Sequence, residues 1–286
     1  MKRLSFRELM TATSLPKHEL WPLLEAASGR RREFILAHDT DMVDVGTQAL
    51  FLRWAKERQA GIPLAYLVGN REFYGRNFWV NAHTLIPRAE TELLIDTARQ
   101  VLDGSGGSGG SDGSGLRLCD LGTGSGCIAV TLALEFPQAA VWASDLSEAA
   151  LQVARNNSAW LGAAARTHFS QGAWWQAFTN APQTFHGIVS NPPYIAPGDP
   201  HLRQGDLRYE PDSALVGQGQ GLGDIFTIVA GAIDRLEPNG FLLIEHGFDQ
   251  QSDVVAIFQQ AGLVRLQGLI DLANNPRAVL GFRAST

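Results

Sequence analysis

The stretch LRLCDLGTGSGCIAV, residues 116–130, decides how most of this chain is expected to fold. It begins as an apolar strand, passes through a glycine-rich loop and continues as an apolar helix from Cys127. The loop consists of Gly122, Thr123, Gly124, Ser125 and Gly126. Glycines let a backbone turn sharply and approach a ligand just before a helix N-terminus. Because dinucleotide folds space these glycines as G-x-G-x-x-G, the G-x-G-x-G spacing favours a ligand without a phosphate, or a tight turn that binds nothing.

Apolar runs and helical stretches alternate along the chain after Pro87. The apolar runs read LRLCDLG, AVWASD, THFSQG, FHGIVSNPPY and GFLLIEHG. This alternation is typical of α/β proteins, and unbroken apolar runs such as residues 241–244 are typical of strands covered on both faces. We therefore predict a doubly wound parallel sheet. The last two runs, LVRLQGLID and AVLGFRA, are separated only by a short loop, which predicts an antiparallel hairpin at the sheet edge.

The N-terminal quarter of the chain has the periodicity of helices. The residues spaced for one buried helical face are Leu20, Leu23, Leu24 and Ala27. A later helix is expected to end at Gly61, because a glycine followed closely by a proline stops helices. The pattern then changes to REFYGRNFWVNAHTL, which is typical of a β-hairpin. These patterns predict a helical domain over residues 1–71, a β-hairpin connector over 72–86 and the α/β domain over 87–286.

The composition argues against several classes of protein. With 23 Lys and Arg against 29 Asp and Glu in 286 residues, the net charge of −6 argues against a dedicated nucleic-acid binder. Cys119 and Cys127 form no C-x-x-C pair and no histidines lie at metal-ligand spacing, so neither a metal site nor a disulfide framework is expected. No leader or membrane-spanning run is recognisable, which predicts a cytoplasmic protein without membrane partners. Residues 103–115, DGSGGSGGSDGSG, read as a flexible linker without a chemical role.

Two features suit an adenosine group. The second strand ends in ASD, which places Asp145 beside the glycine loop, where a carboxylate can accept from both hydroxyls of a ribose. NAD and S-adenosylmethionine both carry such a ribose, and capping of the helix near Ser147 is the alternative role. Trp174 and Trp175 follow the third strand. One indole can stack on an adenine ring, unless both pack in the core.

The fourth strand ends in NPPY, across the switch point of the sheet from the glycine loop. The motif comprises Asn191, Pro192, Pro193 and Tyr194. The prolines lack N–H donors and leave carbonyl oxygens to face the pocket, and the Asn191 amide oxygen is a further acceptor. Tyr194 offers an aromatic face. The pattern predicts a planar amide or amine as the target, unless the loop only ends a strand. No His, Cys or Lys adjoins the motif as a strong base, so catalysis would depend on positioning.

These motifs make the chain resemble the release-factor glutamine methyltransferase family, known as PrmC or HemK. The motifs that carry the resemblance, in order over essentially the whole length, are GIPLAYLVG, REFYG, TLIPRAETELL, DLGTGSGCIAV, SNPPYI, DPHLRQGDLRYEP and LLIEHG. The resemblance implies a Rossmann-like class I S-adenosylmethionine-dependent methyltransferase sheet, preceded by a helical domain that recognises the substrate. It also implies methyl transfer from S-adenosylmethionine to the side-chain amide nitrogen of the glutamine in the GGQ motif of peptide chain release factors.

The resemblance also implies roles for individual residues. The implied cofactor-binding residues are Gly122, Thr123, Gly124, Ser125, Gly126, Asp145, Trp174 and Asn191. The implied substrate-binding residues are Asn191, Pro192, Pro193 and Tyr194, with Asn191, Pro192 and Tyr194 acting in catalysis. The chain departs from its relatives at Ala173, where they commonly carry an acidic residue, so one cofactor contact is expected to be absent.

Three other functions have some support from the same motifs. A ribosomal-protein glutamine methyltransferase is similar in sequence, although TLIPRAETE favours the release-factor branch. An N6-adenine DNA methyltransferase would also use NPPY, because base amines suit its acceptors, but the acidic charge argues against direct nucleic-acid binding. A non-catalytic binding module with a degenerate fold is supported only by Ala173. Release factors therefore remain the expected partners.

Overall fold

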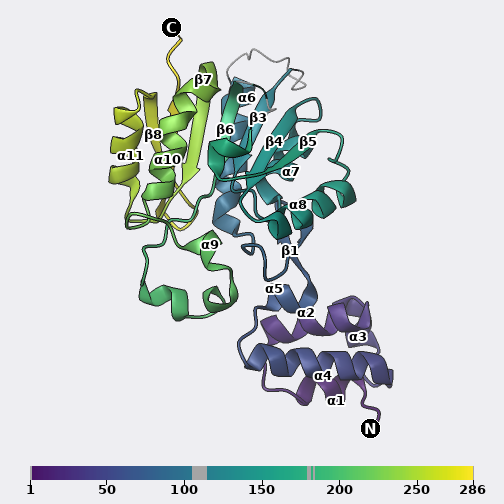
Figure 1. Ribbon diagram of the computed structural model, residues 1–286. Coiled ribbons are helices and arrows are strands. Elements are labelled where there is room, and N and C mark those ends of the chain that lie inside the picture. The colour runs from purple at the N-terminus through teal and green to yellow at the C-terminus, as the bar shows by residue number, and fades with distance from the viewer. Residues whose placement is uncertain (1, 105–114, 179–181, 183, 286) are drawn as a thin grey trace. The chain divides into compact units, whose positions relative to one another are not determined.

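The computed structural model describes residues 2–104, 115–178, 182 and 184–285 (Figure 1). Most of the glycine and serine tract predicted as a linker, residues 103–115, lies outside the described residues. The chain forms two compact units. One comprises the residues up to Asn70 together with Arg203–Tyr209, and the other comprises Arg71–Leu202 and the residues from Glu210 onward.

The first unit is a set of short helices. They are α1 (Phe6–Thr11), α2 (Lys17–Ser28), α3 (Arg32–Ala37), α4 (Val45–Gln59) and α5 (Leu64–Val68). The predicted face of α2 is confirmed: Leu20, Leu23 and Leu24 are buried, and Ala27 packs against the same core cluster. The predicted end of the later helix is also confirmed, because α4 stops just before Gly61, whose φ of 103° an L side chain rarely adopts.

A segment from much later in the chain completes the first unit. Arg58 on α4 hydrogen-bonds to Glu19 at 2.7 Å and to Asp206, which is 148 residues away, at 2.8 Å. The Tyr209 hydroxyl donates to the Ala60 carbonyl oxygen at 2.7 Å. The predicted domain boundaries assign all residues after 86 to one domain. They therefore do not include residues 203–209 in the helical unit. Contacts between such distant positions leave no periodic pattern in the local sequence.

The hairpin is shorter than the predicted span of residues 72–86. Its strands are β1 (Asn70–Phe73) and β2 (Arg76–Trp79). The two residues between them, Tyr74 and Gly75, have φ values of 53° and 72°, as a tight two-residue hairpin turn requires. Asn157 of α8 (Glu148–Trp160) accepts from the Trp79 N–H and donates to the Trp79 carbonyl oxygen, so β2 is held to α8 within the second unit. Residues 80–88 continue without strand structure.

The second unit is built on a seven-stranded sheet. Its strands are β3 (Arg117–Leu121), β4 (Ala140–Asp145), β5 (Thr167–Gln171), β6 (Phe185–Ser190), β7 (Leu236–Glu245), β8 (Val264–Ile270) and β9 (Pro276–Phe282). The spatial order is β5-β4-β3-β6-β7-β9-β8. Neighbouring strands from β5 to β7 are parallel, whereas β9 runs antiparallel to β7 and β8. The predicted doubly wound sheet with an antiparallel edge hairpin is confirmed.

Helices cover both faces of this sheet. The helices of this unit are α6 (Glu92–Gly104), α7 (Cys127–Glu135), α8 (Glu148–Trp160), α9 (Asp212–Leu215), α10 (Gly223–Ala232) and α11 (Gln251–Gln260), of which α9 is a short helix at the cavity and not on a sheet face. Short 3-10 turns are η1 (Ala89–Thr91), η2 (Trp174–Ala177), η3 (Pro200–Arg203), η4 (Leu207–Tyr209) and η5 (Ile233–Arg235). Because strand side chains alternate between faces, Leu118 joins the core under α6 and α7, while Cys119 joins the core under α10 and α11.

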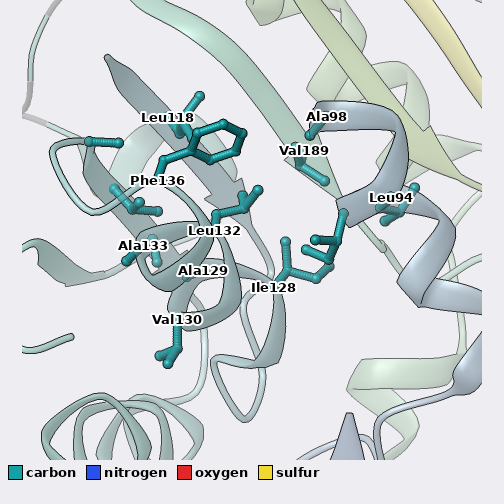
Figure 2. Close-up of a cluster of buried hydrophobic side chains, with 14 of the residues drawn as sticks. Leu94, Ala98, Leu118, Ile128, Ala129, Val130, Leu132, Ala133, Phe136 and Val189 are labelled. Carbon is teal, nitrogen blue, oxygen red and sulfur yellow. The ribbon is translucent and has the colours of Figure 1, made fainter. Parts of the chain in front are cut away.

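Figure 2 shows how α7 is packed against the sheet. Leu132 of α7 and Phe136, the residue that follows this helix, lie beside Leu118 of β3, and Ala98 of α6 lies near Val189 of β6. Burial of one Leu or Phe side chain stabilises a fold by roughly 1.5–3 kcal/mol relative to exposure. This packing fixes the start of α7, and with it the glycine loop that precedes the helix.

Candidate active site

The glycine loop and NPPY leave two adjacent parallel strands. Leu121, which ends β3, is in register with Ser190, which ends β6. The Ser190 hydroxyl donates to the Leu121 carbonyl oxygen at 2.6 Å and ties the two strand ends together. After β3 the sheet grows toward β5, and after β6 it grows toward β8, so this pair is the topological switch point, where open α/β sheets bind ligands. The predicted juxtaposition of the two motifs is confirmed.

The glycine loop is held by the neighbouring strand end and by a buried carboxyl group. The N–H groups of Gly122 and Thr123 both donate to the Ser144 carbonyl oxygen at 2.9 Å. Asp120 Oδ2 accepts from the Thr123 hydroxyl at 2.6 Å and from the Ala129 N–H at 3.1 Å. Burial raises the pKa of Asp120 to about 7. Hydrogen bonds to Ser144 and Asp120 thus fix the conformation of the glycine loop.

The three glycines of the loop have different reasons to be glycine. All have positive φ values, of 76° for Gly122, 55° for Gly124 and 82° for Gly126. A Cβ on Gly126 would lie 3.0 Å from Ala154 Cβ, so this glycine permits helix packing. A Cβ on Gly124 would meet nothing within 4 Å. Gly124 thus leaves open space beside the backbone, as close approach of a ligand requires.

Asp145 lines the cavity, and the predicted alternative of helix capping falls to Ser147, whose side chain accepts from the Ala150 N–H at the start of α8. Asp145 Oδ2 accepts from the Gly124 N–H at 2.8 Å, and its Oδ1 accepts from the Ser147 N–H at 2.8 Å. Burial raises the pKa of Asp145, against the lowering effect of these backbone hydrogen bonds. A carboxylate oxygen can accept more than one hydrogen bond, so both oxygens keep capacity for the hydroxyls of a ribose.

The two tryptophans have different surroundings. Trp174 lines the cavity and packs against Gly122, where a Cβ would lie 3.2 Å from the indole ring. Its φ of 48° is unusual for a bulky side chain. Trp175 instead donates from Nε1 to the Ile228 carbonyl oxygen at 3.0 Å and covers Gly231 of α10. Only Trp174 is placed to stack on a ligand in the cavity.

The cavity has a volume of about 360 Å³, within the usual range of small-molecule sites. Of the residues predicted to bind cofactor or substrate, those that line it are Gly122, Gly124, Asp145, Trp174, Asn191 and Pro193. The predicted residues that do not line it are Thr123, Ser125, Gly126, Pro192 and Tyr194. Thr123, Ser125 and Pro192 are buried.

Several lining residues have no role in the sequence analysis. Those far from the glycine loop and Asp145 in sequence are His83, Thr84 and Leu85 before η1, and Ser213, Ala214, Val216, Gln218 and Asp224 around α9 and α10. The only sequence signal for them is that they lie in or near TLIPRAETELL and the segment that follows DLRYEP, which carry the resemblance without an evident chemical pattern.

Tyr194 is not among the residues that line the cavity. Its hydroxyl donates to Glu245 Oε1 at 3.2 Å, and its ring packs with the core under α10. Asn191, in contrast, lies at the cavity wall, and its Nδ2 donates to Thr91 Oγ1 at 3.1 Å. A hydrogen bond from the hydroxyl leaves the face of the ring free, so the role of Tyr194 as an aromatic platform for the target stays a prediction.

The residues present fit S-adenosylmethionine. Trp174 offers an indole face for an adenine, and Asp145 offers acceptors for ribose hydroxyls. The charged side chains that line the cavity are those of Asp145 and Asp224, and among the described lining residues none is Lys or Arg. An acidic wall suits a ligand that carries a cationic sulfonium and repels one that carries phosphates.

Other kinds of site find no support in the described part of the chain. Within residues 2–104, 115–178, 182 and 184–285, no group of three or more His, Cys, Asp or Glu side chains is arranged to hold a metal ion. Cys119 and Cys127 are free thiols. The helices of these same residues include none that is both long and apolar enough to span a membrane.

Comparison with known proteins places the chain in a family. Residues 5–69 match the PrmC N-terminal domain, and residues 111–204 match the methyltransferase small domain. The release factor glutamine methyltransferase of Bordetella pertussis is 44% identical over 276 residues, which are 96% of this chain and 98% of that protein. The enzyme of the same name from Neisseria gonorrhoeae is 44% identical over 278 residues, 97% of each chain.

A solved structure supports the fold independently. The N-terminal domain of human METTL16 in complex with SAH superposes with a TM-score of 0.52 at 16% identity, over 80% of this chain and 83% of that one. Since such a likeness shows the fold alone, the family rests on the two full-length relatives. Because these relatives are 44% identical over nearly the whole length of both proteins, the chain belongs to the release factor glutamine methyltransferase family.

Proposed function

We propose that this protein is an S-adenosylmethionine-dependent enzyme that methylates the side-chain amide nitrogen of the glutamine in the GGQ motif of peptide chain release factors. The relatives that share its length and both of its units are release factor glutamine methyltransferases. The observation that carries the proposal is the position of Asn191. It lies on the wall of the cavity that Asp145 and Trp174 also line, with its Nδ2 already held by Thr91.

The chemistry follows from the properties of an amide. When bound, S-adenosylmethionine supplies the methyl group, so that one N–H of the target amide is replaced by N–CH3. An amide nitrogen is a weak nucleophile because its lone pair is delocalised into the carbonyl group. An acceptor on its N–H groups favours the pyramidal nitrogen on which positive charge develops, and it also fixes the nitrogen in place. Asn191 Oδ1 is the acceptor that the cavity wall offers.

The other predicted residues divide into two kinds. We propose that Gly122, Gly124, Asp145 and Trp174 contact the cofactor and that Asn191 and Pro193 contact the target. Thr123, Ser125 and Gly126 would then shape the loop from behind the wall, and Pro192 and Tyr194 would support Asn191 from the core. The catalytic roles that the resemblance implies for Pro192 and Tyr194 would in that case be indirect.

The experiment measures transfer of a radiolabelled methyl group to purified substrates side by side. We expect label on a peptide chain release factor and none on the same factor with its GGQ glutamine replaced by alanine. Label on ribosomal proteins or on DNA, with none on the release factor, would support the other methyltransferase functions instead. Transfer to no substrate, together with no binding of S-adenosylmethionine, would indicate a binding module. A cytoplasmic location stays a prediction, which cell fractionation would check.

We further propose that the helical unit recognises the release factor. It has its own core, and it includes residues 203–209, a segment that follows NPPY closely in the sequence. Arg58→Ala removes the side chain that binds Asp206 and Glu19. We expect a higher KM for the release factor and an unchanged Kd for S-adenosylmethionine. Arg53→Ala is the matched control, since Arg53 is exposed on the same helix and pairs with Glu57 only at 4.0 Å. An unchanged KM in Arg58→Ala would count against recognition by this unit.

A further inference from the structure

A chain of hydrogen bonds runs from Asn191 at the cavity into the core. Asn191 Nδ2 donates to Thr91 Oγ1 at 3.1 Å, and the Thr91 hydroxyl donates to Glu245 Oε2 at 2.8 Å. The second carboxylate oxygen, Oε1, accepts from the Tyr194 hydroxyl at 3.2 Å. Thr91 and Glu245 are 3% and 1% exposed. The four side chains come from η1, from the end of β7 and from NPPY, and they meet only in the folded protein.

The direction of these hydrogen bonds is determined by the carboxylate. An ionised Glu245 can only accept, so both the Tyr194 and the Thr91 hydroxyl groups point their protons toward it. A threonine hydroxyl has a single proton, which leaves only lone pairs on Thr91 Oγ1 to face Asn191. Therefore only the NH2 group of the Asn191 amide can face Thr91, and the amide oxygen is turned the other way. None of the residues that the structure describes donates to that oxygen.

We propose that Thr91 and Glu245 are positioning residues that fix the orientation of the Asn191 amide, so that its oxygen faces the target nitrogen. This inference rests on the proposed function, because it assumes that Asn191 accepts from the target amide. Both residues act through Asn191 and do not touch the substrate. If the Asn191 amide were reversed, its NH2 group would face the NH2 group of the target. Two NH2 groups would then face each other, and the nitrogen of the target amide would have no hydrogen-bond acceptor from Asn191.

The surrounding contacts hold Thr91 in place. Glu210, which is 5% exposed, accepts from the Ile86 N–H at 2.9 Å and forms an ion pair with Arg88. These contacts fix the chain just before η1, which ends at Thr91. Three motifs therefore contribute to the orientation of the Asn191 amide. They are TLIPRAETELL, DLRYEP and LLIEHG, which contain Thr91, Glu210 and Glu245.

Three variants and a matched control test the proposal. Thr91→Val removes the hydroxyl and keeps the shape, whereas Thr91→Ser keeps the hydroxyl. Glu245→Gln keeps the shape and removes the charge. In this variant the Tyr194 hydroxyl would donate to the new amide oxygen, and the new NH2 group would donate to Thr91. The direction of the hydrogen bonds between residue 245, Thr91 and Asn191 would then be reversed. Thr131→Val is the control, since Thr131 is a fully buried threonine of α7 whose hydroxyl has no partner among the described residues.

We expect Thr91→Val and Glu245→Gln to lower kcat at saturating substrates at least tenfold, with KM for the release factor changed less than threefold. Thr91→Ser should restore kcat to within threefold of wild type, and Thr131→Val should leave it within twofold. The Kd for S-adenosylmethionine, measured by calorimetry, should stay within twofold in all four. A kcat within threefold of wild type in both Thr91→Val and Glu245→Gln would overturn the proposal, as would equal losses in Thr91→Val and Thr91→Ser.

The pH profile gives a second readout that a structural role would not change. Burial raises the pKa of Glu245 to about 7, and the charged or titratable groups around it are Glu90 of η1, Cys127 of α7, Tyr194 and Arg277 of β9. A protonated Glu245 can donate to Thr91, which reverses the direction of the hydrogen bonds from Glu245 through Thr91 to Asn191. The wild-type kcat should therefore fall as pH drops from 8 to 6. The Glu245→Gln profile should lack that fall, and a profile parallel to wild type would contradict the proposal.

A measurement without turnover separates this inference from the proposed function. In the apo protein, the NMR signals of the Asn191 NH2 group should show slow exchange with water because one N–H is bound to Thr91. Fast exchange is expected in Thr91→Val and slow exchange in Thr91→Ser. If Asn191→Ala retains wild-type kcat, the proposed function fails. If Asn191→Ala is inactive while Thr91→Val is fully active and keeps slow exchange, only the role of Thr91 and Glu245 fails.

Discussion

The two sides of the cavity are assembled from different distances along the chain. On the cofactor side, the glycine loop and Asp145 lie about two dozen residues apart, and backbone N–H groups make most of the contacts. On the target side, Asn191 depends on Thr91, which is 100 residues away, and through it on Glu245, a further 154 residues from Thr91. The cofactor side is therefore determined by local backbone geometry, and the target side by contacts between side chains in the finished fold.

This difference has a consequence for substitutions. A change on the cofactor side should alter the affinity for S-adenosylmethionine, because its contacts are the same in the ground state and the transition state. A change on the target side should alter kcat, because the acceptor acts on charge that develops during transfer. Four substitutions test whether the two sides are separable in this way.

The largest expected effect is that of Asn191→Ala. Loss of one oriented polar group at the reacting atom costs on the order of 10²–10³ in kcat. The Kd for S-adenosylmethionine should stay nearly unchanged in calorimetry, although the resemblance also implies a cofactor contact for Asn191. Single-turnover methylation of a release factor measures the loss. Activity within threefold of wild type would refute the assignment, and a large loss of cofactor affinity would show that the two sides are not separable.

A second effect concerns stability, and it isolates the buried carboxyl of the target side. The pKa of Glu245 is about 7 in the folded protein, raised from 4.5 by burial. Between these values the folded state holds a proton that the unfolded state has lost, so stability decreases as pH rises from about 4.5 to 7. At 1.36 kcal/mol per pKa unit, the total is about 3 kcal/mol.

Glu245→Gln lacks this titration. Urea unfolding at pH 5, 6, 7 and 8 should therefore show a gap between variant and wild type that widens in favour of the variant and levels off above pH 7. A gap that is constant with pH would mean that Glu245 titrates at its ordinary value, and the argument from burial would be withdrawn.

Asp145→Ala tests the cofactor side. A hydrogen bond to a charged group contributes roughly 1.5–3 kcal/mol, so S-adenosylmethionine should bind about tenfold to a hundredfold more weakly. The turn should also loosen, because the carboxylate accepts from the Gly124 and Ser147 N–H groups. Calorimetry gives the affinity and thermal unfolding gives the structural part. Unchanged affinity would leave Asp145 with its hydrogen bonds to the Gly124 and Ser147 N–H groups as its only role.

The smallest expected effect is that of Ala173→Asp, beside Trp174 on the cavity wall. An acidic side chain there can accept from the adenine amino group or from a nearby N–H, which a methyl group cannot. S-adenosylmethionine should bind about fivefold more tightly, which corresponds to roughly 1 kcal/mol. The kcat at saturating cofactor should barely change, since adenine contacts are the same in both states. Weaker binding would show that the pocket is arranged around alanine.

The sequence by itself determined the strands of the sheet and their order along the chain. The apolar runs predicted each strand from β3 to β9, and the glycine loop predicted where α7 begins. It also determined that the loop and NPPY meet, because the carboxyl ends of neighbouring parallel strands lie at one edge of a sheet. These features follow from periodicity and from the few residues that tolerate positive φ, and both are properties of short segments.

Only the tertiary structure decided which side chains act together. It turned Trp174 toward the cavity and Trp175 into the core, and it gave the Tyr194 hydroxyl to Glu245. It also returned residues 203–209 to the helical unit. Each of these outcomes depends on a hydrogen-bond partner or a packing partner more than 50 residues away. Local patterns carry no record of such partners, because their identity is fixed only when burial and hydrogen bonding are satisfied over the whole chain at once.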